Sequence, residues 1–120
     1  MSNKQIHLID DDPLNNLINR KLITRILPEA LITEDIDAGK ALERIKNDFT
    51  PDLILLDINM PGMNGWDFLD HFQKMGKEIA VYILTSSIDS ADYRKAESYK
   101  LVKKYIEKPL NSQKITNLFS

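Results

Sequence analysis

The chain of 120 residues has no cysteine, one tryptophan, four glycines and no long apolar segment. Without cysteine it can form neither disulfides nor thiolate metal sites, which agrees with a reducing compartment. Its longest apolar run, IAVYIL at 79–84, is too short to cross a bilayer, and the N-terminal MSNKQIHLID lacks the apolar core of a signal peptide. These absences predict a cytoplasmic protein that does not insert into a membrane.

Neither the charge nor the organisation of the chain points to an unusual partner or to several domains. The formal net charge is −2, whereas a general nucleic-acid-binding protein carries a basic excess, so we expect no direct binding to nucleic acid. There is no internal repeat, low-complexity tract or Gly/Ser linker. A chain of this length therefore predicts one domain over residues 1–120.

Short apolar runs alternate along the chain with segments of helical period. The predicted strands are 6–9, 31–33, 53–56, 79–84 and 104–106. The predicted helices are about 13–27, 39–48, 66–75, 90–100 and from about 112 onward. Strands that alternate with helices in this way indicate an α/β fold with a doubly wound, five-stranded parallel sheet.

The first predicted helix carries an apolar stripe whose members recur at intervals of three or four residues. The stripe consists of Leu14, Leu17, Ile18, Leu22 and Ile26. Such a stripe predicts the side of the helix that faces the core. On this prediction Asn15, Asn19 and Arg25 face solvent.

Polar side chains follow the carboxyl ends of the predicted strands. Acids follow the first and third strands, hydroxyl groups the fourth and a lysine the fifth: Asp10, Asp11, Asp12, Asp57, Thr85, Ser86, Ser87 and Lys108. Because the ligand site of an open α/β sheet lies outside these strand ends, we expect the groups to converge on one edge. The second strand also ends in acids, Glu34 and Asp35, so an acidic strand end alone is not diagnostic.

Several carboxylates, a hydroxyl and a lysine in one place are typical of a magnesium-dependent phosphoryl site. Carboxylates in one crevice repel each other, and a hard divalent cation such as Mg²⁺ relieves that repulsion through oxygen ligands. The lysine and the hydroxyl supply the charge and the hydrogen bond that a phosphoryl group needs. Asp57 directly follows the buried run LILL of a central strand and is the best-placed acceptor.

These residues together resemble a known family over essentially the whole chain. Asp10-Asp11, Asp57, Thr85 and Lys108-Pro109, with MPGMNG after Asp57, resemble the receiver domain of bacterial two-component response regulators. The resemblance implies a flavodoxin-like (CheY-like) three-layer sandwich with the strand order 2-1-3-4-5. It also implies a cis peptide bond between Lys108 and Pro109.

The resemblance further implies how the chemistry is shared among the matching residues. Asp57 would accept a phosphoryl group from the phosphohistidine of a sensor histidine kinase or a histidine phosphotransfer protein. Lys108 would pair with the phosphoryl oxygens. The domain would catalyse its own phosphorylation and dephosphorylation rather than act on a separate substrate. The groups that would hold Mg²⁺ are the carboxylates of Asp10, Asp11 and Asp57 and the main-chain carbonyl of Asn59.

A conformational switch is part of the same resemblance. Thr85 would donate a hydrogen bond to the phosphoryl group and move inward, which frees space for the ring of Tyr105. Ser87 would control the access of water to the acyl phosphate. The helix near 90–100, the strand at 104–106 and the last helix would bind a downstream target protein.

Structural interpretations compete with these roles. Taken singly, Asp57 and Thr85 could each cap a turn. Lys108 could be a solvated lysine, and Tyr105 could be an ordinary aromatic residue of a strand. Asp12, directly before Pro13, is better explained as a helix cap than as a ligand. A cluster of basic residues lies near the last predicted strand and consists of Arg94, Lys95, Lys100, Lys103 and Lys104. These residues either protect an edge strand or steer an acidic partner toward the surface.

Three other classes of protein are alternatives to the receiver. Phosphatases of the haloacid dehalogenase type need a second aspartate two positions after the nucleophile, and that position is Asn59 here. A flavodoxin-like flavin carrier needs hydroxyl and amide groups in its first loop, where this chain has three acids. The remaining alternative is a receiver-shaped interaction module that acts independently of phosphorylation.

Overall fold

A computed structural model describes residues 4–86 and 89–119. Within these ranges strands and helices alternate as predicted, and the fourth helix ends at Glu97 rather than near residue 100. None of the helices in this part of the chain is long and apolar enough to span a membrane. The elements are β1 (Gln5–Ile9), α1 (Pro13–Ile26), β2 (Leu31–Asp35), α2 (Ala38–Lys46), β3 (Leu53–Leu56), α3 (Gly65–Gln73), β4 (Ala80–Thr85), α4 (Ser90–Glu97), β5 (Val102–Glu107) and α5 (Ser112–Phe119).

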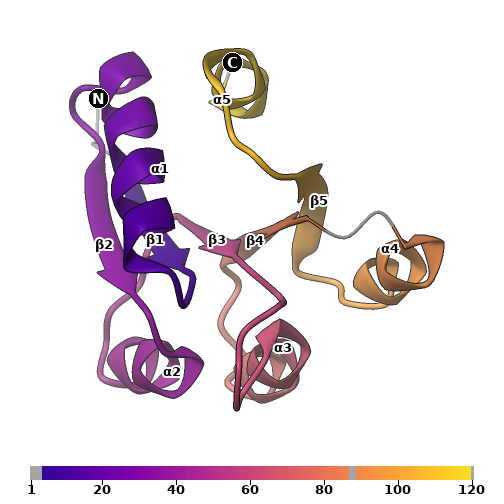
Figure 1. Cartoon of the computed structure of the whole chain (residues 1–120). Helices are drawn as coiled ribbons and strands as arrows, with labels where there is room; N and C mark the ends of the chain where they lie inside the picture. The colour runs from indigo at the N-terminus through magenta and orange to yellow at the C-terminus, as the bar shows by residue number, and fades with distance from the viewer. Residues whose placement is uncertain (1–3, 87–88, 120) are drawn as a thin grey trace.

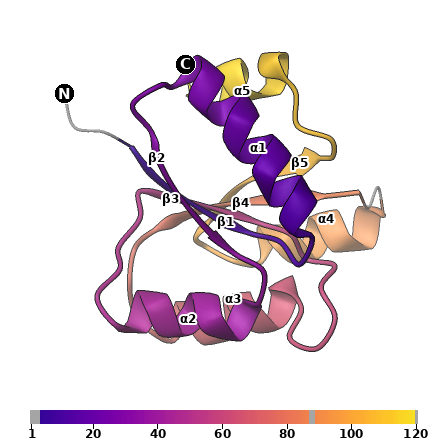
Figure 2. The same ribbon diagram turned by 60° about the vertical axis from the view of Figure 1, so that its left-hand side comes forward.

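The five strands form one parallel sheet in the order β2-β1-β3-β4-β5, which confirms the predicted fold. Helices α1 and α5 cover one face, and α2, α3 and α4 cover the other (Figures 1 and 2). Ile9 pairs with Leu56, and the N–H of Asp57 donates to the carbonyl of Ile9 over 2.9 Å. The residues that follow β1 and β3 therefore leave the sheet at the same level.

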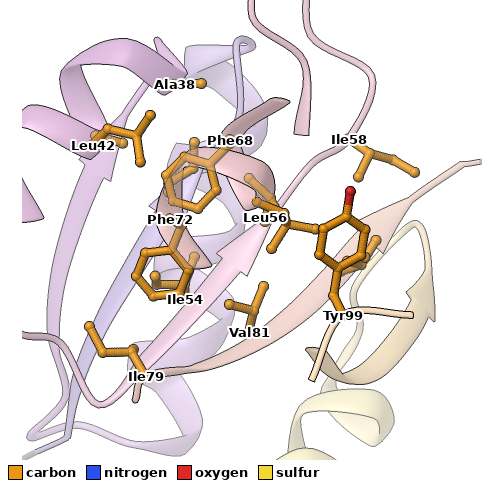
Figure 3. Close-up of a cluster of buried hydrophobic side chains, with 14 of the residues drawn as sticks. Ala38, Leu42, Ile54, Leu56, Ile58, Phe68, Phe72, Ile79, Val81 and Tyr99 are labelled. Atoms are coloured by element: carbon orange, nitrogen blue, oxygen red, sulfur yellow. The ribbon is translucent and has the colours of Figure 1, made fainter. Parts of the chain in front are cut away.

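The central strand β3 is buried on both faces, as its unbroken apolar sequence predicts. Ile54 and Leu56 belong to the core beneath α2 and α3, where Phe68 and Phe72 stack with their centroids 5.6 Å apart (Figure 3). The alternate residues of β3 belong to the core beneath α1 and α5. Each fully buried side chain of this size contributes about 1.5–3 kcal/mol to stability, so the two cores hold the sheet rigidly behind the site.

The predicted buried side of α1 was wrong in its first half. Leu14, Leu17 and Ile18 are 61%, 41% and 47% exposed, whereas Asn16 and Asn19 are buried together with Ile23. The N-terminal half of α1 lies over the polar carboxyl ends of the strands, because the helix starts there and runs back across the sheet. Amide side chains satisfy that surface, and apolar burial begins where the helix reaches the interior of the sheet.

Gly65 lets the start of α3 pack directly on the loop that leaves β3. A Cβ atom at this position would lie 2.5 Å from the Cα of Ile58 and 2.9 Å from the carbonyl oxygen of Asp57. No side chain fits in that space. A capping box between Asn64 and Asp67 fixes the first turn of α3 just before this contact.

An aromatic contact joins α3 to the segment after α4. Trp66 stacks on Tyr99 with ring centroids 5.8 Å apart, and the ammonium of Lys95 lies 5.0 Å from the centre of the Trp66 ring. The hydroxyl of Tyr99 donates to Asp70 over 2.7 Å. Burial and the nearby carboxylate raise the pKa of Tyr99 to about 12, so the hydroxyl stays protonated and keeps this hydrogen bond.

Candidate functional site

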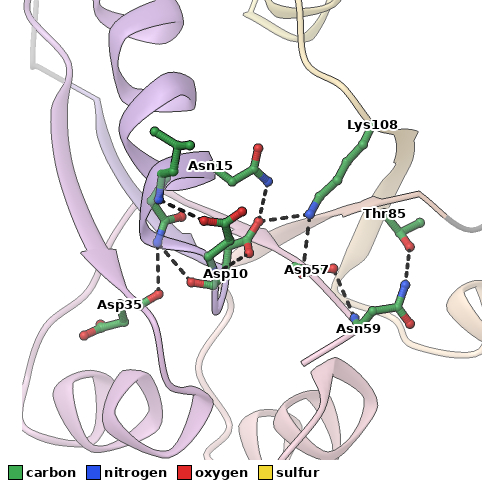
Figure 4. A network of polar contacts seen from close by, with 10 residues as sticks. Asp10, Asn15, Asp35, Asp57, Asn59, Thr85 and Lys108 are labelled. Carbon is green, nitrogen blue, oxygen red and sulfur yellow. Dashed lines mark hydrogen bonds and ion pairs between the residues drawn. The ribbon is translucent and has the colours of Figure 1, made fainter. Parts of the chain in front are cut away.

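The carboxyl ends of β1, β3, β4 and β5 bring the predicted site residues together (Figure 4). Asp10 follows β1, Asp57 follows β3, Thr85 ends β4, and Lys108 follows β5. Asp10, Asp57 and Thr85 are 4%, 5% and 0% exposed. The N–H of Lys108 donates to the carbonyl of Thr85 over 2.7 Å, and the Lys108-Pro109 peptide bond is cis.

Asp57 is a buried carboxylate whose negative charge is only partly compensated by its neighbours. Its Oδ1 accepts the N–H of Asn59 over 3.1 Å, and its Oδ2 lies 3.4 Å from the Nζ of Lys108. Burial raises the pKa of Asp57, and this outweighs the Asn59 N–H and the Lys108 charge, which both favour the carboxylate. The environment of Asp57 therefore favours any further positive charge that enters the pocket.

Lys108 is the cation of this pocket. Its Nζ lies 3.0 Å from Oδ2 of Asp10 as well as 3.4 Å from Oδ2 of Asp57. Burial alone would lower the pKa of Lys108, but the hydrogen bond to Asp10 and the charge of Asp57 raise it, so the ammonium stays protonated. Among the described residues this one ammonium stands against a cluster of three carboxylates, Asp10, Asp11 and Asp57, which leaves an excess of negative charge.

The three acids fit a hard divalent cation. Asp10, Asp11 and Asp57 each offer one carboxylate oxygen, and these oxygens lie within 4.8 Å of one another. Asp11 makes no hydrogen bond or ion pair with the residues at 4–86 and 89–119, so its carboxylate is available as a ligand. Oxygen donors with a net negative charge suit Mg²⁺ rather than a softer metal.

The predicted switch residues lie on β4 and β5. Oγ1 of Thr85 accepts a hydrogen bond from Nδ2 of Asn59 over 3.2 Å, a role for the Asn59 side chain that the sequence did not suggest. The ring of Tyr105 meets Tyr93 of α4 edge to face, with centroids 5.5 Å apart. Ser87 lies outside the described residues.

Helix α1 contributes two donors to Asp10 that sequence reasoning missed. Nδ2 of Asn15 donates to Oδ2 of Asp10 over 2.6 Å, and Nδ2 of Asn16 donates to the Asp10 carbonyl over 3.1 Å. Asp12 caps α1 as predicted, because its Oδ1 accepts the N–H of Leu14 over 3.0 Å. The helical period alone gave no signal for Asn15, which the apolar stripe had assigned to solvent.

The acid at the end of β2 belongs to a different arrangement. The guanidinium of Arg44 donates to both carboxylate oxygens of Asp35 over 2.9 and 3.0 Å, and Nε2 of His7 lies 2.6 Å from Oδ2. Burial would raise the pKa of Asp35, but Arg44 and His7 lower it overall. The negative charge of Asp35 is therefore compensated by side chains of the protein itself.

Comparison with known proteins agrees with this geometry. A family model described as the response regulator receiver domain matches residues 6–120. The nitrate/nitrite response regulator protein NarL of Escherichia coli K12 is 34% identical over 93 residues, which cover 75% of this chain and 42% of NarL. The Regulator of RpoS of the same strain is 31% identical over 94 residues, covering 78% of this chain and 27% of that protein. The chain thus spans less than half the length of these relatives.

Solved structures resemble the chain over nearly its full length. A two-component response regulator from Cytophaga hutchinsonii has a TM-score of 0.85 and 34% identity, covering 99% of this chain and 96% of that one. A CheY-like receiver domain protein from Methanospirillum hungatei has a TM-score of 0.82 and 26% identity, covering 98% and 90% of the two chains. With its strand order and its acidic edge, the chain belongs to the response regulator receiver domain family of phosphorylation-based signalling.

Proposed function

We propose that Asp57 of this chain accepts a phosphoryl group from the phosphohistidine of a histidine kinase or of a histidine phosphotransfer protein. The observation that carries the proposal is the setting of Asp57: a buried carboxylate 3.4 Å from the Lys108 ammonium, in a group of three acids whose oxygens lie within 4.8 Å. Residues 1–120 act in this proposal as one cytoplasmic receiver domain that switches the binding of a partner protein.

The transfer forms one bond and breaks one. An oxygen of the Asp57 carboxylate attacks the phosphorus, the P–N bond of the phosphohistidine breaks, and its electron pair returns to the imidazole nitrogen. The Asn59 N–H holds Oδ1 of Asp57, and Oδ2 faces Lys108. The Lys108 ammonium then neutralises the charge that develops on the phosphoryl oxygens. Hydrolysis of the acyl phosphate in the same pocket returns the domain to its starting state.

Asp10, Asp11 and Asp57 are the residues that would hold Mg²⁺, together with the main-chain carbonyl of Asn59. When bound, the ion supplies positive charge that offsets both the carboxylates and the incoming phosphoryl group. One lysine against three acids leaves a pocket that repels an anionic phosphodonor, so we expect phosphorylation to depend on the divalent ion.

Thr85 and Tyr105 form the proposed switch. Thr85 is buried at the end of β4, beside the strand that carries Tyr105, and it would donate its hydroxyl to the phosphoryl group. Its movement would change the packing around Tyr105 and so the contact between Tyr105 and Tyr93 on α4. A local charge change at Asp57 would reach the molecular surface by this route.

The proposed output surface consists of α4, β5 and α5 and takes an acidic downstream target. A groove of about 500 Å³ on this surface is lined by Tyr93 and Tyr105 and by the basic residues Lys103 and Lys104. Because Tyr105 lines the groove, a rotation of its ring would change the shape that a partner meets. The surrounding lysines would raise the association rate with an acidic partner at low salt.

The proposal is tested with a small phosphodonor such as acetyl phosphate. We expect one phosphoryl adduct by mass spectrometry that requires Mg²⁺ and is released by hydroxylamine. Asp57→Asn should abolish the adduct, and the control Asp52→Asn should retain it, because Asp52 lies exposed before the opposite end of β3. An equal adduct on Asp57→Asn would contradict the assignment.

The output surface needs a separate measurement. Lys100, Lys103 and Lys104 are reversed to glutamate, and phosphorylation is measured independently of partner binding. Phosphorylation should survive, while association of the activated form slows and loses its salt dependence. Binding that is the same in Asp57→Asn and in the phosphorylated wild type would instead identify a module that acts without phosphorylation.

A further inference from the structure

The carboxylate of Asp10 is held by three donors. Its Oδ1 accepts the N–H of Asp12 over 2.9 Å. Its Oδ2 accepts Nδ2 of Asn15 over 2.6 Å and Nζ of Lys108 over 3.0 Å. Two side chains from opposite ends of the sequence thus meet on one oxygen of a residue that is 4% exposed. Both of them contribute to the orientation of the Asp10 carboxylate.

The two side-chain donors differ in what else attracts them. Lys108 also lies 3.4 Å from Asp57, and a full positive charge on a flexible stem follows the strongest nearby anion. Asn15 is neutral, and in the described part of the chain its side chain donates to Asp10. A new anion on Asp57 therefore competes for Lys108 far more strongly than for Asn15.

The backbone around Asn15 is held in place. Helix α1 is capped by Asp12 one residue before Pro13, and the next residue, Asn16, donates to the carbonyls of both Asp10 and Asp35 over 3.1 and 3.4 Å. Asn16 is 1% exposed. The Asn15 amide is therefore presented to Asp10 from a rigid first turn rather than from a mobile loop.

We propose that Asn15 is a positioning residue that keeps the Asp10 carboxylate turned into the acidic pocket when Lys108 moves from Asp10 to a phosphoryl group on Asp57. The inference rests on the proposed function of Asp57 and Lys108. In the unmodified protein either donor holds Asp10. Once Lys108 has moved, Asn15 is the side chain that still fixes the carboxylate, and the pocket keeps its affinity for a divalent cation.

A double-mutant cycle tests, without any phosphorylation, whether Asn15 holds Asp10 when Lys108 does not. The Mg²⁺ dissociation constant is measured by calorimetry for wild type, Asn15→Ala, Lys108→Ala and the double variant. Loss of Asn15 alone should weaken binding about twofold, whereas the same change in the Lys108→Ala background should weaken it about tenfold, because it then removes the last side-chain hydrogen bond to the Asp10 carboxylate. A purely structural role would give equal factors in both backgrounds.

Beryllium fluoride, a mimic of a phosphoryl group on a carboxylate, provides the second arm. The Mg²⁺ concentration for half-saturation should rise about tenfold in Asn15→Ala when beryllium fluoride is present, as in the Lys108→Ala background. The control Leu17→Ala shortens an exposed side chain on the same helix and should change neither constant. Unchanged melting temperatures establish that the variants fold.

The outcomes separate this inference from the proposed function. Equal factors in the two backgrounds overturn the role of Asn15, even if Asp57 is phosphorylated normally. In the absence of beryllium fluoride, a loss of about tenfold in the Lys108→Ala background against about twofold in the wild-type background supports it, even if acetyl phosphate fails to label Asp57. An effect of Leu17→Ala as large as that of Asn15→Ala also overturns it, because any truncation of α1 would then suffice.

Discussion

Two buried aspartates at the same edge of the sheet have pKa values that shift in opposite directions. Asp35 ends β2 and is 7% exposed, and Asp57 follows β3 and is 5% exposed. The pKa of Asp35 is lowered, because Arg44 and His7 overcome the effect of burial. The pKa of Asp57 is raised, because burial outweighs one N–H and a lysine that it shares with Asp10. Similar burial thus accompanies opposite shifts of the pKa.

The difference lies in the number of donors that each acid receives. Asp35 has a two-pronged guanidinium and an imidazole of its own. The negative charge of Asp57 is only partly balanced within the protein, so a cation from outside can balance the rest. An acid whose charge is balanced internally serves the fold, and an acid whose charge is not balanced is poised for chemistry. Four predictions test this distinction.

The largest effect should follow from Asp57→Asn. Acyl phosphate formation should fall by more than about 100-fold, because the nucleophile is lost. The free energy of unfolding should hold or rise, since a buried carboxylate with incomplete compensation is replaced by a neutral amide. Labelling by a phosphodonor and urea denaturation measure the two quantities. A large loss of stability would mean that Asp57 is as structural as Asp35.

The converse change, Asp35→Ala, should damage the fold and spare the chemistry. Breaking a fully buried ion pair costs about 3–5 kcal/mol. The Arg44 side chain is 45% exposed and regains water, so we expect a loss of about 2 kcal/mol. Urea denaturation gives the loss, and labelling of Asp57 should persist. The control Glu43→Gln changes an exposed residue of α2, the helix that carries Arg44, and should have no effect. A loss no larger than that of the control would contradict the structural role.

The pH dependence of stability should reveal His7. Burial lowers its pKa below the ordinary 6.5, and this outweighs the attraction of Asp35. The unfolded chain therefore binds a proton more readily, and stability should fall as the pH drops below about 6.5, by at most about 1.4 kcal/mol per pH unit. Urea denaturation between about pH 7.5 and about pH 5.5 measures this slope.

Asp57 acts in the opposite direction and must be removed from that measurement. Its raised pKa means that the folded protein takes up a proton first as the pH falls, which adds stability. The comparison is therefore made in Asp57→Asn, with and without His7→Gln. The amide of glutamine keeps a donor for Asp35 but does not titrate, so the slope should become shallower. An identical slope would assign the pH dependence to other groups.

The smallest effect should follow from Glu34→Gln. Glu34 stands beside Asp35 at the end of β2 and pairs with Arg20, whose side chain is 47% exposed. The Glu34 side chain is 20% exposed, and a partly exposed pair of this kind contributes about 0–1 kcal/mol. We expect a change in unfolding free energy below about 0.5 kcal/mol and unchanged labelling of Asp57. A larger effect on either quantity would mean that position at a strand end matters more than charge compensation.

The features that depend on the local sequence pattern were predictable from the sequence. Alternating apolar runs specified the strands and helices, and the rule for parallel sheets located the edge where Asp10, Asp57, Thr85 and Lys108 meet. Asp12 before Pro13 was identifiable as a cap for the same local reason. The roles of these residues in catalysis and switching remain predictions.

Contacts between distant elements were not predictable in this way. The stripe of Leu14, Leu17 and Ile18 satisfies the helical period but lies outside, because the polar strand ends beneath α1 require the amide of Asn16. No local pattern indicates that Asn15 reaches Asp10 or that Arg44 reaches Asp35 across nine residues. These contacts depend on how helices sit over the sheet, and the same sequence period fits more than one such placement.

The stack of Trp66 on Tyr99 gives the molecule an intrinsic fluorescent reporter. Trp66 is the one tryptophan of the chain, so all emission excited at long wavelength arises from one place. Its ring lies between α3 and the segment after α4, with the Lys95 ammonium 5.0 Å away. A nearby charge and a stacked phenol both tune the emission of an indole. Any displacement of α4 against α3 should therefore change the emission wavelength or intensity of Trp66, and no attached dye is needed to observe it.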